Sequence, residues 1–440
     1  MRRGLILAAG LLLAAMPASA RPDCPDSLID QAFLLAFPVS ELVRTRAAAL
    51  GRAAAAGPAP LNRFRHRQSL SSPADRGVTT PNVDTLYSSA WFDLSAGPLV
   101  LDMPATASRY VSIAIMDMAG DHLAILHSGG HDATRVALVR QVGSKTDQAG
   151  KVVRLPVDRG WIIARVFVAG PHDLAAARSV QAAISLSGPV PALPSGPAGN
   201  DTAAELLASV NAELSAGPPP PALARELPKL GCTGLGRGAD GWQGLPDDTR
   251  SRWQERMPQL LTSLKAGFAT EAEAGGWRRA HPATGRPDAP PQVRAAIALS
   301  GLGALPTSEA LYYRTDRDAQ GKDLNGRHRY AVRIPAQMPA EAFWSLTLYE
   351  RLPDGRLFLA ANRDERYAIN SASAGLGKEP DGSMLIMIGG TAPHDRSANW
   401  LPAPAGPISL VLRLYQPRRE ALDGRFIPPP VALQAEASPN

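Results

Sequence analysis

Apolar positions follow two different periods along the chain, and the changes of period divide it into helical and β-rich stretches. Residues 26–55 are rich in Ala and Leu and predict a helix, which Pro38 breaks or restarts. Short apolar or alternating runs follow, bounded by Gly, Pro, Asp or Ser, as is typical of strands in an antiparallel sandwich. The clearest of these runs are 85–94, 99–101, 110–116, 151–155 and 161–168. Asp173 is then expected to cap a helix through Leu186.

The middle of the chain has a different composition, rich in Pro, Gly and Ser. Residues 187–197 and the tract 217–221 are typical of linkers. Helical patterns lie between and after them, at 201–214, 247–273 and 291–302. Strand patterns return after about residue 307, at 329–334, 343–349, 384–388 and 408–414. Because proline cannot donate a ladder hydrogen bond, the segments around Pro402, Pro417 and 428–430 are expected at sheet edges.

These patterns predict a mainly β fold, α+β overall, in which helices join two β-rich domains. The expected division is a signal peptide at 1–20, an N-terminal helical segment at 21–60, a β-sandwich domain at 61–190, Pro-rich linkers with a helical connector at 191–306, and a second β domain at 307–432.

Residues 1–20 have the features of a secretory signal peptide. Arg2 and Arg3 precede an apolar stretch that ends at the small-residue cleavage site Ala18-Ser19-Ala20. The apolar stretch is too short to span a bilayer, and no later segment is long and apolar enough. We therefore expect a soluble periplasmic or secreted protein that is cleaved near Ala20 and has no transmembrane span.

The charge balance is mild for a chain of this length. The formal net charge of +6 falls to +4 when Arg2 and Arg3 leave with the signal peptide. The run 63–67 (Arg-Phe-Arg-His-Arg) is a local basic cluster that could meet an anionic ligand or a lipid head group, or form a solvated face. Given the export signal, nucleic acid is not an expected partner.

The sequence contains no G-x-S-x-G, H-E-x-x-H or phosphate-loop motif. It therefore gives no motif evidence for a serine hydrolase, a zinc protease or a nucleotide site.

The chain has two cysteines, Cys24 and Cys232. In an oxidising compartment, the simplest expectation is one disulfide between the mature N-terminus and a central loop. Two buried thiols are the alternative. Neither cysteine belongs to a C-x-x-C pair, so redox chemistry and a cysteine zinc site lack support.

A polar and aromatic run at 80–94 is the first candidate site. Pro81 to Asp84 predicts a turn, because proline lacks an N–H group and Asn and Asp bond readily to nearby backbone. The turn would present Asn82, Asp84 and Tyr87 at the mouth of a strand. Two interpretations stay open: a ligand site, or a structural turn that is locked by its own Asx bonds.

Two sets of motifs resemble known families. The stretch TPNVDTLYSSAWFDLSAGP (80–98), followed by Arg109-Tyr110 and the run 116–118, is similar to domain of unknown function 1254, over roughly 64–186. A later set resembles its usual companion, domain of unknown function 1214, over roughly 307–430. Its motifs are EALYYRTDRDAQG (309–321), FWSLTLYE (343–350), NWLPAPAGP (399–407) and LRLYQP (412–417).

The resemblance implies an immunoglobulin-like sandwich followed by a jelly-roll-like one, and it implies no established reaction. The chain departs from the family pattern after Asp117. Where the family tends to run through an aromatic-rich stretch, this chain has a loop at 119–132 that contains His122, His127 and His131.

That histidine loop is a candidate metal site. Imidazoles and carboxylates are the usual ligands of zinc and similar divalent ions, and Asp121 and Asp132 accompany the three histidines. The spacing of His122, His127 and His131 matches no known signature, and on a straight strand the first two would point to opposite faces. A solvent-exposed hairpin tip is the alternative.

Paired carboxylates are the candidates for acid–base chemistry. Asp84 and Asp117 lie at neighbouring predicted strand ends, and Glu309 opens the second β domain. Two carboxyl groups a few ångströms apart can separate their pKa values and serve as acid and base.

Aromatic side chains, 5% of the chain, could stack on sugar rings or fill the sandwich cores. The aromatic candidates are Tyr87, Trp91, Tyr312, Trp344 and Tyr349.

The leading functional hypothesis is a cofactor-independent protein that binds a small polar or sugar-like ligand in a cleft between its β domains. Arg366, Arg413 and Lys378 could bind an anionic group of such a ligand, or form surface salt bridges. The alternatives are a hydrolase or lyase that uses Asp84 or Asp117 with Glu309, and a structural or envelope-interaction module. A divalent metal is expected only if the histidine loop binds one. The ligand and the oligomeric state, including a homo-oligomer, stay open.

Overall fold

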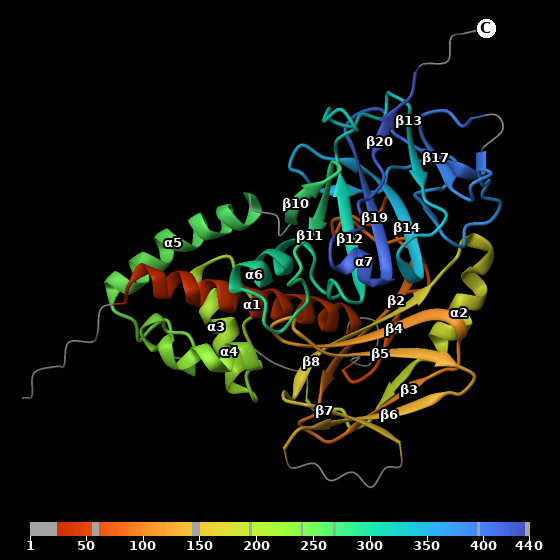
Figure 1. Cartoon of the computed structure of the whole chain (residues 1–440). Coiled ribbons are helices and arrows are strands. Elements are labelled where there is room, and N and C mark those ends of the chain that lie inside the picture. Colours follow the sequence, from red (N-terminus) through yellow and green to blue (C-terminus); the bar gives the residue numbers. More distant parts are fainter. Residues whose placement is uncertain are drawn as a thin grey trace, which may run out of the picture.

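The computed structural model describes residues 24–54, 61–142, 150–192, 196–238, 241–266, 270–393 and 397–435, so the predicted signal peptide lies outside the described residues. The chain folds into a layer of helices and two pairs of β-sheets (Figure 1). The helices of this layer lie on the left of Figure 1, the N-terminal sheets at the lower right and the C-terminal sheets at the top. Within these ranges, none of the helices combines the length and apolar character that crossing a bilayer requires.

The helical layer combines segments that are far apart in the sequence. Its helices are α1 (Asp26–Ala54), α3 (Ala203–Ser215), α4 (Pro221–Glu226), α5 (Asp247–Ala266) and α6 (Pro291–Ser300). Helix α1 lies at its centre, with Phe33 and Leu42 fully buried in a core shared with the other four helices. Contrary to the predicted break, α1 continues through Pro38, and Ser40 Oγ donates to Phe37 O in that turn. Burial of the apolar faces on both sides of the proline stabilises the helix despite the lost hydrogen bond.

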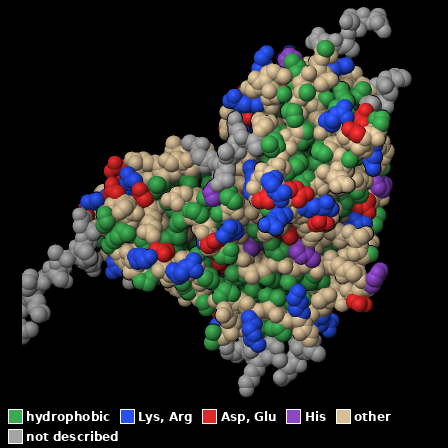
Figure 2. Space-filling model, in the orientation of Figure 1, with side chains coloured by type: hydrophobic (Ala, Val, Ile, Leu, Met, Phe, Trp, Pro, Cys, Tyr) green, Lys and Arg blue, Asp and Glu red, His purple; other side chains and the backbone are tan. Residues whose placement is uncertain are grey.

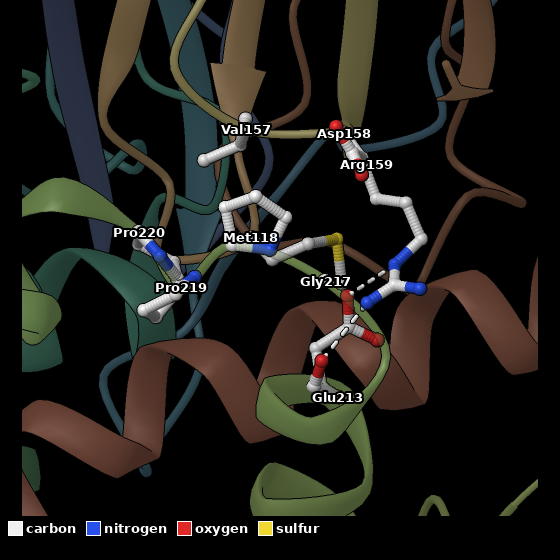
Figure 3. A pocket seen from close by; sticks show the side chains of 9 residues that line it. Met118, Val157, Asp158, Arg159, Glu213, Gly217, Pro219 and Pro220 are labelled. Atoms are coloured by element: carbon white, nitrogen blue, oxygen red, sulfur yellow. Dashed lines mark hydrogen bonds and ion pairs between the residues drawn. The ribbon is translucent and has the colours of Figure 1, made fainter. Parts of the chain in front are cut away.

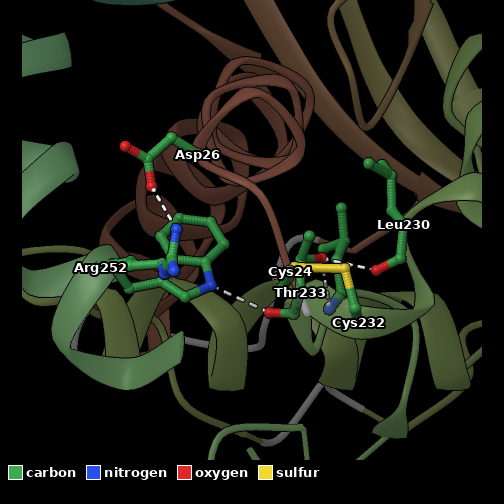
Figure 4. The surroundings of a disulfide bond; sticks show 8 residues. Cys24, Asp26, Leu230, Cys232, Thr233 and Arg252 are labelled. Carbon is green, nitrogen blue, oxygen red and sulfur yellow. Dashed lines mark hydrogen bonds and ion pairs between the residues drawn. A yellow bond between two sulfur atoms is a disulfide. The ribbon is translucent and has the colours of Figure 1, made fainter. Parts of the chain in front are cut away.

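A disulfide between Cys24 and Cys232 joins the start of α1 to a short turn of the helical layer, which confirms the predicted pairing (Figure 4). The two Cα atoms are 5.4 Å apart, within the range of ordinary disulfides. Beside the bond, Trp253 Nε1 donates to Thr233 O at 2.9 Å. The N-terminal helical segment and the connector, which the sequence separates by about two hundred residues, therefore form one layer.

The N-terminal β region contains two sheets around one apolar core. The strand orders are β1-β2-β8-β4-β5 and β7-β6-β3-β9, and all pairs are antiparallel except β6 with β7. The strands are β1 (Arg65–His66), β2 (Thr85–Asp93), β3 (Leu99–Met103), β4 (Ala107–Asp117), β5 (His122–Gly130), β6 (Thr134–Arg140), β7 (Lys151–Leu155), β8 (Arg159–Phe167) and β9 (Ser185–Ser187). Leu86 and Ile113 of the first sheet share a buried cluster with Leu101 and Val136 of the second, so the inner faces of the sheets pack together.

The C-terminal β region repeats this arrangement with a larger first sheet. Its order is β10-β11-β12-β19-β14-β15, with β16 paired to β14, and the second sheet is β18-β17-β13-β20. The strands are β10 (Thr270–Ala274), β11 (Trp277–Ala280), β12 (Ala310–Thr315), β13 (Tyr330–Ile334), β14 (Ala340–Arg351), β15 (Leu357–Phe358), β16 (Ala368–Asn370), β17 (Met384–Gly389), β18 (Trp400–Pro402), β19 (Ile408–Pro417) and β20 (Val431–Leu433). As predicted, Pro402 lies in an edge strand, and Pro417 ends its strand.

Two predicted helices are wrong at their C-terminal ends. The helix predicted over 247–273 ends at Ala266, and the hairpin β10–β11 follows, because Gly275 and Gly276 adopt φ of 60° and 83° at its turn. The helix predicted through 186 is α2 (Leu174–Ala182), and β9 follows it. Asp173 does not cap α2 with its side chain; it binds Arg109 through two bonds of 2.6 Å.

The overall class is therefore α+β, with four sheets, none of them closed into a barrel among the described residues. The immunoglobulin-like and jelly-roll-like descriptions remain what the family resemblance implies, and the domain boundaries stay a prediction.

The outer face of the five-stranded N-terminal sheet packs against the outer face of the C-terminal sheet that contains β12, β19 and β14. One buried cluster contains Tyr110 and Ala114 of β4 together with Ala310 of β12, Phe343 of β14 and Tyr415 of β19. In Figure 1 the strands β12, β19 and β14 stand above β2 and β4. The residues between these two sheets form a separate layer, which we call the intersheet layer.

Charged side chains of both signs are interspersed on the face shown in Figure 2, without a patch of one sign. The predicted basic cluster at 63–67 is likewise dispersed: Arg67 pairs with Asp75 at 2.6 Å, and Arg65 Nη1 donates to Ala49 O at 3.5 Å. Arg65 and Arg67 thus bind different neighbours and do not form one basic surface.

Candidate functional site

Two matching rows of polar side chains face the intersheet layer, one from each sheet. Residues directly opposite each other on neighbouring strands point to the same face of a sheet, so the strand register identifies both rows. The N-terminal row is Tyr87 (β2), Arg165 (β8), Ser112 (β4) and His127 (β5). The C-terminal row is Tyr312 (β12), Arg413 (β19), Ser345 (β14) and Asn370 (β16). Each row therefore begins with Tyr-Arg-Ser and has its arginine on a central strand.

Both arginines are buried, and they differ in their partners. Arg413, 2% exposed, donates from Nη1 to Thr347 Oγ1 at 2.8 Å and from Nη2 to Tyr349 Oη at 2.7 Å. Arg165, 5% exposed, donates from Nη2 to Gly303 O at 2.7 Å, and its guanidinium lies 5.3 Å from the centre of the Tyr87 ring. Within the described ranges, Arg165 Nη1 has no hydrogen-bond partner.

Gly303, which accepts that bond, has a backbone conformation that favours glycine. Its φ is +78°, and a Cβ atom there would lie 2.8 Å from Ile163 Cδ1. The loop after α6 can therefore approach β8 closely enough for its carbonyl to reach Arg165.

Four aromatic rings close one side of the layer. The ring centres of Phe167 and Phe343 are 4.0 Å apart, those of Phe343 and Tyr415 are 4.1 Å apart, and Tyr110 meets Tyr415 edge to face at 5.4 Å. Burial raises the pKa of both tyrosines well above the usual value, so the phenols stay protonated. The aromatic wall contributes no negative charge to the layer.

The turn at 81–84 reaches this layer, and the predicted Asx lock is present; the ligand interpretation stays a prediction. Asn82 Oδ1 accepts from the backbone N–H of Asp84 at 2.6 Å, which is the predicted Asx lock. Asn82 Nδ2 also donates to Tyr415 Oη of the facing sheet at 2.6 Å. Asp84 is fully buried, and burial raises the pKa of its carboxyl although the nearby Arg413 lowers it.

Glu309 lies at the other end of the rows and links the two sheets. Its Oε1 atom accepts from Tyr110 Oη at 2.6 Å and lies 2.9 Å from His127 Nε2. The carboxylate is buried, whereas the His127 side chain is 38% exposed. A buried carboxylate that orients a more accessible imidazole is an arrangement used in acid–base catalysis.

The structure separates Asp117 from Asp84 and Glu309, so the predicted pairing of Asp84 and Asp117 at neighbouring strand ends is wrong. Thr85 pairs with Phe167 on β8, whereas Asp117 pairs with Gly160. These positions are seven residues apart on β8, or about 23 Å along the strand. Asp117 instead lies beside Asp121, which is ion-paired with Arg294 of α6.

The three histidines of the candidate metal site are not brought together. A register shift between Ile115 and Met116 turns His122 to the same face as His127, but their partners on β4 are four residues apart, about 13 Å. His122 Nδ1 lies 3.2 Å from Gly285 O, and His131 is exposed. Across the described ranges, no group of three or more His, Cys, Asp or Glu side chains is arranged to hold a metal ion.

The predicted aromatic residues divide between the layer and the cores. Tyr87 and Tyr312 belong to the rows, and Tyr349 Oη donates to Pro81 O at 2.8 Å. Trp91 stacks on a second indole at 5.1 Å and belongs to the helical core, and Trp344 belongs to the C-terminal sandwich core. The core alternative therefore holds for the two tryptophans.

Sequence reasoning missed Arg165. Its signal was present: a single cation interrupts the apolar run Trp-Ile-Ile-Ala-Arg-Val-Phe-Val at 161–168. A charged residue at the centre of a buried strand is costly unless it is paired or functional. Arg413, in Leu-Val-Leu-Arg-Leu-Tyr, has the same signal and was a candidate.

Two small cavities lie where the helical layer meets the N-terminal sheets. One cavity lies beside Arg159, Glu213 and Pro219 and has a volume of about 10 Å³ (Figure 3). The other lies beside Asp121 and Arg294 and has about 20 Å³. Each is large enough for about one water molecule, so neither suits a sugar-sized ligand.

Comparisons with known proteins support the family. Residues 61–188 match protein of unknown function (DUF1254), and residues 309–419 match protein of unknown function (DUF1214). The crystal structure of the VPA0106 protein from Vibrio parahaemolyticus is 22% identical, with a TM-score of 0.72 over 93% of this chain and 100% of that chain, which shows a shared fold.

An uncharacterised protein from Burkholderia cenocepacia is 12% identical, with a TM-score of 0.46 over 95% of this chain and 91% of that chain, too distant to carry an argument. No curated protein matches the chain. With both family domains in the expected order, the chain belongs to the family that combines DUF1254 and DUF1214 domains.

Proposed function

We propose that the protein binds a small polar, sugar-like molecule in the intersheet layer, between the row of Arg165 and the row of Arg413. The observation that carries this proposal is the facing pair of Tyr-Arg-Ser rows. Buried polar groups in folded proteins are almost always hydrogen-bonded, yet Arg165 Nη1 and Asp84 Oδ2 have no partner among the described residues. A polar ligand would supply those partners.

Partial exposure of three polar side chains of the layer also supports binding. Tyr87, Tyr312 and Asn82 are only half-buried although they lie between two sheets, so solvent reaches them. Aromatic faces with nearby hydrogen-bonding groups are the usual surroundings of small ligands, and interfaces between β regions are favoured places for them.

Adjacent tyrosines on β12 provide a matched test. Tyr312 faces the intersheet layer, whereas Tyr313 faces the core of the C-terminal sandwich. Mature protein (residues 21–440) would be incubated with a small-molecule extract, washed, and analysed by native mass spectrometry. We expect a retained small molecule in the wild type and in Tyr313→Phe. Retention should be about fivefold weaker in Tyr312→Phe, since one hydrogen bond is worth about 1 kcal/mol. No retained molecule, or equal retention in both variants, would overturn the proposal.

An enzyme is the second candidate, favoured by the contact of Glu309 with both His127 and Tyr110. In this alternative Glu309 orients His127 as the general base, and Asp117 plays no part. The same extract separates the two functions: an enzyme consumes a compound in molar excess over protein, and Glu309→Gln spares that compound. A binding protein consumes none.

Export to an oxidising compartment is part of the proposal. The disulfide Cys24–Cys232 supports it, because structural disulfides persist mainly outside the cytoplasm. The signal peptide pattern at 1–20 agrees with that location.

A further inference from the structure

Arg165 is not ion-paired with either carboxylate of the intersheet layer, Asp84 or Glu309, among the described residues. Its neighbours are the phenol rings of Tyr87, Tyr312, Tyr110 and Tyr415. Among the described residues, it forms no ion pair with a carboxylate; its one hydrogen bond goes to the carbonyl of Gly303, and Nη1 has no partner. Buried charges in proteins are otherwise paired or bound to an opposite charge, so this guanidinium indicates a missing anion.

The surrounding side chains do not provide that anion. Glu309 is bonded to Tyr110 and His127 rather than to Arg165. Burial raises the pKa of Tyr312, and the nearby arginines offset this only in part, so its phenol is neutral near pH 7. Burial and the charge of Arg165 lower the pKa of His122 to about 4, so this imidazole is neutral too. His122 Nε2, buried close to Arg165, also lacks a partner among the described residues.

Arg413 differs in this respect. Burial alone would lower the pKa of Arg413, but Tyr349, Tyr415 and the nearby charge of Asp84 raise it. The layer thus has one arginine whose pKa a nearby carboxylate raises and one whose guanidinium forms no ion pair among the described residues. A ligand with a single negative charge, placed at Arg165, matches this difference.

We infer that Arg165 binds the carboxylate of a small hydroxylated acid of the sugar-acid type, an inference that rests on the proposed binding function. A guanidinium edge with a free Nη1–H group matches carboxylate geometry. The hydroxyl groups of such a ligand would face Tyr87 and Tyr312, whose rings lie beside Arg165 and whose side chains are partly accessible.

The test compares three probes that share one sugar ring: galacturonate, its methyl ester, and galactose. Only galacturonate carries the carboxylate. Binding to the mature wild-type protein would be measured by isothermal titration calorimetry at pH 7. We expect galacturonate to bind at least tenfold more tightly than either neutral probe. The advantage should disappear in Arg165→Gln and persist in Arg333→Gln, a matched control on the exposed side of β13.

Each outcome has a definite meaning. Equal binding of all three probes would overturn the assignment of a carboxylate to Arg165 and leave the proposed sugar-like ligand standing. Absence of binding by every probe at millimolar concentration would overturn both. If Arg165→Gln does not fold, the wild-type preference for galacturonate over its methyl ester still decides the question, because these two differ in charge at one position.

Discussion

Replacement of Asp117 by Asn should change how stability depends on pH. Asp117 is fully buried where β4 meets the helical layer, and its Oδ1 atom accepts from the backbone N–H groups of Ala119 and Asp121 at 2.8 and 3.1 Å. Burial, with the charge of Asp121, raises the pKa of Asp117 to about 7, although the two backbone bonds and Arg294 lower it. The folded protein therefore holds this proton far above the pH at which the unfolded chain releases it.

The magnitude follows from the shift. A rise from 3.8 to about 7 is about three pKa units, and each unit corresponds to about 1.4 kcal/mol, so Asp117 accounts for about 4 kcal/mol. Because the folded pKa is raised, this stability is fully present below pH 3.8 and is lost as the pH rises to about 7. Asn keeps the acceptor oxygen and does not titrate. Its buried amide costs about 1 to 3 kcal/mol, which leaves a net gain of about 1 to 3 kcal/mol at pH 8.

Urea denaturation followed by tryptophan fluorescence at pH 4.5, 6 and 8 measures this change. Asp117→Asn should be less stable than the wild type at pH 4.5 and more stable at pH 8. Asp132→Asn, at an exposed position, serves as the control and should follow the wild type throughout. A variant whose unfolding free energy keeps the wild-type slope with pH would refute the reasoning.

Three further predictions concern the helical layer and the histidine loop. Glu213 pairs with Arg46 at 2.5 Å and with Arg159 at 2.9 Å, so Glu213→Gln should cost about 3 to 5 kcal/mol by urea denaturation at pH 7. Although burial opposes them, the two arginines lower the pKa of Glu213, so this cost should shrink as the pH falls below 4.5. The double change Cys24→Ser and Cys232→Ser should destabilise by about 2 to 5 kcal/mol, and an unchanged melting temperature would contradict a structural role. Chelator treatment should leave the melting temperature unchanged; a shift would restore the metal hypothesis for the loop.

Much of the site was predictable because its residues lie in distinctive local patterns. The turn 81–84, Tyr87, Glu309 and Tyr312 all reach the intersheet layer, and each lies in a motif with strong turn or strand chemistry. Strand existence was predictable for the same reason, since period-two runs bounded by turn residues are specific.

The remainder depends on tertiary packing, which one sequence does not contain. Whether Trp91 and Trp344 face a ligand or a core depends on which sheet face each adjoins, and both faces of these sheets are covered. Whether Asp117 lies near Asp84 depends on the order of the strands in the sheet. Strand β8 lies between β2, which follows Asp84, and β4, which ends at Asp117. The sequence shows that Arg165 interrupts an apolar run, but only the folded structure shows that its guanidinium has no ion-pair partner among the described residues.

A crystal structure of the mature protein with galacturonate would test the central claim most directly. We expect the sugar between the two rows, with its carboxylate within hydrogen-bond distance of Arg165 Nη1. Galacturonate bound elsewhere on the protein, with Arg165 still unpartnered, would contradict it.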